Sequence, residues 1–132
     1  VGQAYQELYG RLKQYAEAGL MICFHRSHGD LAPWNCLWSE QGLFVYDWEA
    51  SEPQGMALGD AFAYATAPAL LLQRKPSPDR TLLAALRMAN KVARAAGREL
   101  DSRVYLALWL FGQLAKTGFS GQMIVALART WR

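Results

Sequence analysis

The feature that most constrains the fold of this chain is the stretch NCLWSEQGLFVYDW at residues 35–48. Two runs rich in apolar and β-favouring residues, 35–39 and 43–48, flank the turn sequence SEQG. Gly42 is the permissive residue of that turn, since it tolerates backbone angles that other residues avoid. The pattern predicts a two-stranded hairpin.

Segments on both sides of this hairpin have the apolar spacing of amphipathic helices. Residues 1–20 form the first of them, and Gly19 is its expected end. Four more are expected after the hairpin: residues 57–73, a helix capped by Ser77 that stops at Gly97, one that begins at Asp101 or Ser102 and runs to Gly118, and one capped by Ser120. The predicted fold class is mostly α with a small β-hairpin.

Composition sets the broad class of protein. A chain of 132 residues that is 52% hydrophobic has the size and the apolar content of one domain with a buried core. The net charge of +3 is small and the arginines look scattered, so nucleic-acid binding is not expected. The longest apolar runs are too short for a membrane span, and two cysteines without a signal-peptide pattern favour a reducing, cytoplasmic location.

Polar residues that are costly to bury occur close to the predicted hairpin. Asp30 and Asn35 lie five positions apart in a segment that Pro33 keeps out of a helix. Asp47 follows the apolar residues 43–46, where a carboxylate is costly to bury unless it pairs or binds a cation. Carboxylate and amide oxygens are ligands of the kind that Mg²⁺ prefers. These residues predict a base candidate, Asp30, beside a two-ligand magnesium site made of Asn35 and Asp47.

The same residues resemble a known family. HGDLAPWN at 28–35, followed by a hairpin and DWE at 47–49, is similar to the catalytic loop and metal motif of the aminoglycoside phosphotransferase and choline kinase-like family, a branch of the protein-kinase-like superfamily. The general kinase pattern is His-Arg-Asp, four residues, Asn, and later Asp-Phe-Gly. The resemblance covers about a third of the chain, roughly residues 21–65.

The resemblance implies a role for each residue of the two motifs. Asp30 would be the catalytic base, which accepts the proton of a substrate hydroxyl as that hydroxyl attacks the γ-phosphate of ATP. His28 would organise the catalytic loop. Asn35 and Asp47 would hold Mg²⁺ on the ATP phosphates, and Glu49 would assist the metal or the substrate. The implied activity is that of a small-molecule kinase acting on a sugar, an aminoglycoside or a choline-like alcohol.

The resemblance also implies a domain organisation. Residues 1–132 would be a kinase-like C-terminal lobe, in which Asp60, in the segment GMALGDAFAYA, bonds back to the catalytic-loop backbone. Such an Asp could equally serve only as a helix N-cap. The sequence contains no Gly-rich phosphate loop and no strand lysine of the kinase type. The N-terminal lobe that covers ATP is therefore expected to precede Val1, and the fragment alone need not be active.

Two other functions remain open at this level. A truncated kinase-like lobe could serve as a non-catalytic interaction module. Alternatively, His25, His28 and Asp30 could form the metal triad of a hydrolase, although their spacing is not that of known zinc motifs.

Three tryptophans, Trp34, Trp38 and Trp48, lie in the same region. Their large apolar area favours packing within the hairpin and the core. Trp34 is the exception to consider, because it lies inside the loop beside the base candidate.

Overall fold

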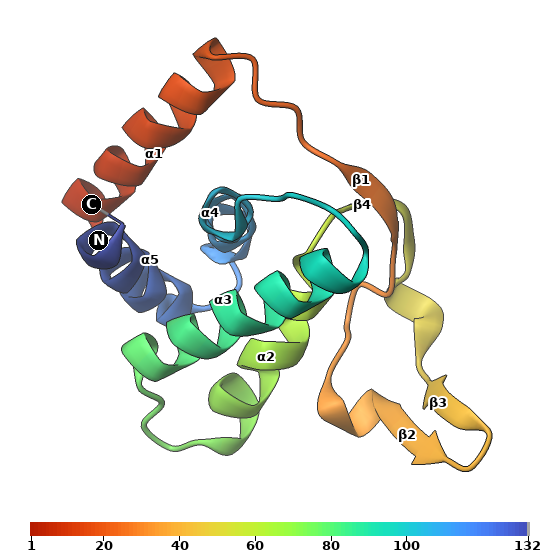
Figure 1. Ribbon diagram of the computed structural model, residues 1–132. Helices are drawn as coiled ribbons and strands as arrows, with labels where there is room; N and C mark the ends of the chain where they lie inside the picture. Colours follow the sequence, from red (N-terminus) through yellow and green to blue (C-terminus); the bar gives the residue numbers. More distant parts are fainter. Residues whose placement is uncertain (132) are drawn as a thin grey trace.

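The computed structural model describes residues 1–131, and within them five α-helices surround an apolar core while two small antiparallel sheets lie at one side (Figure 1). The helices are α1 (Gly2–Glu17), α2 (Gly59–Leu72), α3 (Pro78–Ala95), α4 (Ser102–Gln113) and α5 (Gly118–Thr130). The strands are β1 (Phe24–Ser27), β2 (Cys36–Ser39), β3 (Gly42–Val45) and β4 (Glu52–Met56). The prediction of a mostly α chain with a small β element is confirmed.

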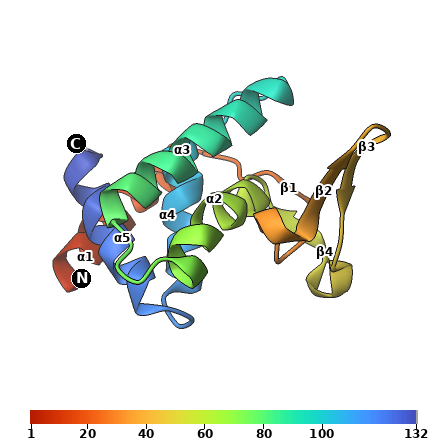
Figure 2. The ribbon, with the colours of Figure 1, turned by 90° about the horizontal axis from the view of Figure 1, so that it is seen from below.

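The predicted hairpin is present as β2 and β3. Its register pairs Cys36 with Val45 and Ser39 with Gly42. Gly42 has φ of 123°, a value that favours glycine and so explains its place in the turn. The hairpin projects away from the helices, as Figure 2 shows.

A second sheet was not predicted from the sequence. Strand β1 pairs antiparallel with β4, Phe24 facing Met56 and His25 facing Gly55, and the register shifts between His25 and Ser27. Gly55 has no room for a side chain, because a Cβ there would overlap the Ser27 side chain. This sheet holds the two ends of the 28–51 segment together and so fixes where that segment leaves the helical body.

The core is formed by the helices rather than by the sheets. Its fully buried side chains include Leu8 from α1, Phe62 from α2, Leu106 and Leu110 from α4, and Ile124 from α5. Each such side chain contributes about 1.5–3 kcal/mol relative to an exposed one. None of the helices in the described part of the chain combines the length and the apolar character needed to cross a membrane.

The ends of the last helices correct two predictions. Helix α4 ends at Gln113 rather than at Gly118, and beyond it the N–H groups of Leu114 and Lys116 bond three residues back, as in a 3₁₀ turn. Thr117, not Ser120, caps α5, and its hydroxyl accepts the N–H of Phe119 at 3.2 Å. Ser120 lies inside α5 and is buried. The expected caps Ser77 and Asp101 were correct.

Candidate functional site

The loop that follows β1 is fastened to the start of α2. Both oxygens of Asp60 accept backbone N–H groups from this loop, Oδ2 from His28 at 2.8 Å and Oδ1 from Gly29 at 3.1 Å. The N-cap of α2 is Leu58, and no side chain caps the helix. The Asp60 carboxylate therefore bonds to the loop rather than to the first turn of its own helix. Contact of this kind is what the family resemblance implies for Asp60.

Gly29 permits the close approach of this loop to the chain that follows the hairpin. Its φ is 87°, in the left-handed region that favours glycine. A Cβ at this position would overlap the carbonyl oxygen of Ala50. In the dipeptide His28-Gly29, the histidine ring hydrogen-bonds through both nitrogens, and the glycine lets the Ala50 carbonyl oxygen approach closely.

The imidazole of His28 is only 2% exposed and both of its nitrogens are used. Nδ1 accepts the backbone N–H of Asp30 at 3.2 Å, so Nδ1 carries no hydrogen. Nε2 must then carry it and donates to the carbonyl oxygen of Tyr46 at 2.6 Å. The ring also packs against Trp48, with the ring centroids 4.7 Å apart. His28 therefore connects the backbone at residue 30 to the backbone just before residue 47.

Asn35 makes the second connection between these two segments. The side-chain Nδ2 of Asn35 donates to the backbone carbonyl of Asp30 at 3.0 Å. The backbone carbonyl of Asn35 accepts the N–H of Tyr46 at 2.7 Å. The amide hydrogens of the side chain thus face the loop, which leaves Oδ1 as the atom that can accept or ligate. The hairpin closes with Asn35 opposite Tyr46, so Asp47 begins immediately beyond this pair.

Asp47 lies just after the hairpin rather than in it, since β3 ends at Val45. Its backbone is left-handed, with φ of 62° and ψ of 58°. A non-glycine residue in this region costs free energy, and such residues cluster at functional sites. Asp47 is exposed, and so is Glu49 in the short 3₁₀ turn Trp48–Ala50 that follows. The Asp47 carboxylate and the Asn35 Oδ1 are hard oxygen ligands of the type that suits Mg²⁺.

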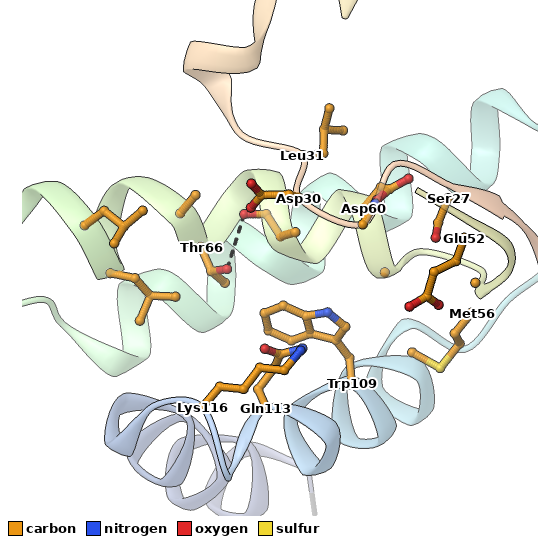
Figure 3. A pocket seen from close by; sticks show the side chains of 17 residues that line it. Ser27, Asp30, Leu31, Glu52, Met56, Asp60, Thr66, Trp109, Gln113 and Lys116 are labelled. Carbon is orange, nitrogen blue, oxygen red and sulfur yellow. Dashed lines mark hydrogen bonds between the residues drawn. The ribbon is translucent and has the colours of Figure 1, made fainter. Parts of the chain in front are cut away.

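A cavity of about 420 Å³ opens beside Asp30 (Figure 3). The loop, β4, α2 and the C-terminal half of α4 line it. Asp30 lies on one side, and Trp109, Gln113 and Lys116 lie across from it, with Glu52 toward one end. The cavity thus combines carboxylates, an amide, an ammonium group and an aromatic face, which suits a small polar molecule.

Four of these cavity residues, Glu52, Trp109, Gln113 and Lys116, were missed in the sequence. Trp109 and Gln113 belong to α4, whose apolar spacing indicated packing only. Lys116 follows α4 in a turn closed by a 2.8 Å bond from its N–H to the Gln113 carbonyl. No local motif marks these positions, because the fold alone brings α4 beside the loop.

The hydrolase triad is contradicted by the structure. The nitrogens of His28 are both engaged by the backbone, so neither is available to a metal. Nδ1 of His25 lies 2.7 Å from the carbonyl oxygen of Arg26. Across residues 1–131, no three His, Cys, Asp or Glu side chains are grouped so as to hold a metal ion. His25, His28 and Asp30 therefore do not form a metal site.

The three tryptophans are exposed, which corrects the expectation that they pack into the hairpin and the core. Trp38 is 75% exposed, and Trp34 and Trp48 are each about half exposed. Trp38 lies on the hairpin, which stands away from the helical body, while Trp34 and Trp48 lie in the short turns on either side of it, where Trp48 packs on His28. Leu37 and Phe44 lie on one face of the hairpin and Trp38 and Leu43 on the other, and large apolar side chains are exposed on both faces.

Comparisons of the chain with protein-family models, with curated proteins and with solved structures found no match. The chemistry of the site therefore rests on the two motifs, 28–35 and 47–49, and on the contacts between them. Those contacts join segments that are separated by the hairpin.

Proposed function

We propose that this chain is the kinase-like C-terminal lobe of an ATP- and Mg²⁺-dependent phosphotransferase that acts on a small-molecule hydroxyl. The observation that carries the proposal is the bridge made by His28, which bonds to the backbone of both Asp30 and Tyr46. It holds the base candidate in a fixed relation to Asp47, the residue that follows Tyr46. A catalytic constellation needs such fixed positioning, because phosphoryl transfer depends mainly on orientation and on neutralising charge.

Each residue then has a role that its surroundings support. Asp30 is exposed and lines the cavity, so its carboxylate can accept the proton of an acceptor hydroxyl bound there. Asn35 Oδ1 and the Asp47 carboxylate would hold Mg²⁺, with Glu49 near enough in the chain to assist. The metal, when bound, would neutralise the charge of the transferred phosphoryl group.

The cavity lining supports a hydroxyl-bearing acceptor. Trp109 offers an apolar face for a ring or an alkyl group, while Gln113 and Lys116 offer hydrogen-bond donors. Glu52 offers an acceptor, or a partner for a cationic group. Sugars, aminoglycosides and choline-like alcohols all present such features to a cavity of this size.

The exposed hairpin surface supports a second lobe as the partner of this one. The hairpin exposes large apolar side chains on both of its faces, and apolar surface of this kind is seldom left uncovered. We propose that a nucleotide-covering N-terminal lobe packs there, in a cytoplasmic enzyme. The same surface would also serve a non-catalytic interaction module, which is the second candidate function.

Catalysis by the intact gene product separates the two candidates. Asp30→Asn is expected to abolish ATP-dependent phosphorylation of a panel of sugars, aminoglycosides and amino alcohols while ATP binding stays largely intact. Asp47→Ala is expected to lose affinity for Mg·ATP, measured by isothermal titration calorimetry. Glu40→Gln, at an exposed acid in the hairpin turn, is the matched control. Turnover that is unchanged in both Asp30→Asn and Asp47→Ala would refute the enzyme and leave the interaction module.

A further inference from the structure

Four cationic side chains that look scattered along the sequence lie on one face of α3. With about 100° of rotation per residue, they fall within a sector of about 60°. They are Arg80, Arg87, Lys91 and Arg94, called the α3 stripe below. The opposite face of α3 is the buried one and carries Leu82, Ala85, Ala89 and Ala93. The stripe therefore points away from the core along about 21 Å of helix.

The charges of the α3 stripe are exposed and unneutralised. All four side chains are exposed. The one acid in α3 is Asp79, which pairs with Arg129. Within residues 1–131, ion pairs join only Lys13 to Glu17 and Arg129 to Asp79. The α3 stripe is thus a local patch of four unpaired cations in a chain whose net charge is only +3.

The loop before α3 adds both charge and apolar surface. Leu72, at the end of α2, is 72% exposed, while Leu71 beside it lines the cavity at Asp30. Arg74 and Lys75 follow in the loop and are exposed as well. This loop lies at an edge of the molecule and runs directly into α3 (Figure 1). Leu72 thus lies a few residues from Arg74, Lys75 and Arg80, at the start of the α3 stripe.

We propose that this region, the α3 stripe with Leu72, Arg74 and Lys75, docks the protein on an anionic phospholipid surface. Cations attract anionic headgroups, and an exposed leucine can enter the boundary between headgroups and acyl chains. A nucleic acid is the less fitting partner, because residues 71–95 contain no aromatic side chain on which a base could stack. The proposal does not depend on the phosphotransferase assignment.

Vesicle co-sedimentation of the intact gene product tests this docking. Vesicles of phosphatidylcholine with roughly 30% phosphatidylglycerol should bind the protein, and pure phosphatidylcholine vesicles should not. Arg87→Gln with Lys91→Gln should weaken binding about 30-fold, since each surface cation contributes about 1 kcal/mol. Leu72→Ser should weaken it too. Raised salt should reduce the binding of the wild type.

Lys13→Gln with Arg26→Gln is the matched control, because it removes the same charge from other exposed positions. Circular dichroism melts verify that all three variants are folded. The proposal is overturned if the control loses as much binding as the stripe variant, or if neutral and anionic vesicles bind alike. It is also overturned if a labelled DNA oligonucleotide binds through the stripe while anionic vesicles do not bind.

Discussion

Nε2 of His28 donates to the carbonyl oxygen of Tyr46 at 2.6 Å, across eighteen positions of sequence that include the whole β2–β3 hairpin. The other nitrogen of the ring accepts the N–H of Asp30. One buried side chain thus satisfies two partly buried backbone groups that are far apart in the sequence. This bond ties the end of the hairpin to the loop where the base candidate lies.

His28→Ala should therefore destabilise the fold and abolish activity together. It leaves the Asp30 N–H and the Tyr46 carbonyl without their partner, at about 1–3 kcal/mol for each group that stays buried. Urea unfolding measures the loss of stability. His25→Ala is the control, since His25 is exposed and contacts only the neighbouring Arg26 carbonyl. Equal stability of the two variants would contradict the bridging role.

Asp60→Asn should loosen the same loop from the other side. One of the two carboxylate oxygens becomes an NH₂ group that faces a backbone N–H of His28 or Gly29, so one bond is lost and two donors oppose each other. A loss of about 1–3 kcal/mol is expected. The measurement is the urea midpoint, together with the exchange rates of the two amide hydrogens.

Asp79→Asn is the control for that variant, because Asp79 also lies in the first turn of a helix but pairs on the surface with Arg129. A surface pair contributes about 0–1 kcal/mol. If Asp60→Asn were no more destabilising than Asp79→Asn, the carboxylate would have no special role in holding the loop.

The sequence predicted correctly those elements whose structure depends on a local pattern of residues. The hairpin, the helix caps at Ser77 and Asp101, and the five helices follow from periodicity and turn residues. Strand β4 was missed because its sequence, EPQGM, contains Pro and Gly, which strands usually avoid. Its pairing with β1 depends on a partner far away in the chain.

The residues of the site fall into the same two groups, those that a local sequence motif predicts and those that only the fold brings together. Asp30, Asn35 and Asp47 belong to motifs that can be recognised in sequence, but Trp109 and Lys116 enter the cavity only because α4 packs beside α2. No sequence window contains both groups. The α3 stripe was missed for another reason: spacings of seven, four and three residues look irregular until they are placed on a helix.

Gly29→Ala should destabilise the loop. The φ of 87° is unfavourable for alanine, and the new Cβ would overlap the Ala50 carbonyl oxygen. The expected cost is more than about 1 kcal/mol, because the clash involves backbone rather than a side chain that can move aside.

Gly10→Ala is a control in which the change in stability is expected to have the opposite sign. Gly10 lies inside α1 with free space around it, so alanine should stabilise that helix by about 0.5–1 kcal/mol. Thermal unfolding of both variants gives the comparison, and a Gly29→Ala protein as stable as the wild type would contradict it.

Tyr105→Phe should change how stability depends on pH. Tyr105 is 1% exposed, and its hydroxyl accepts the N–H of Cys23 at 2.9 Å. Burial raises the pKa of Tyr105 above its ordinary value of 10.0, because the phenolate would be poorly solvated. The folded chain then keeps this proton at pH values where the unfolded chain loses it, so the wild type loses stability as the pH rises above about 10.

Phenylalanine removes that loss, but it leaves the Cys23 N–H unpaired at a cost of about 1–3 kcal/mol near neutral pH. Urea unfolding at about pH 7 and about pH 10.5 should therefore show a less stable variant at the lower pH and a smaller difference at the higher one. Tyr9→Phe, at an exposed tyrosine, should follow the wild type at both. A constant gap between Tyr105→Phe and the wild type would show that Tyr105 is not protonated preferentially in the folded state.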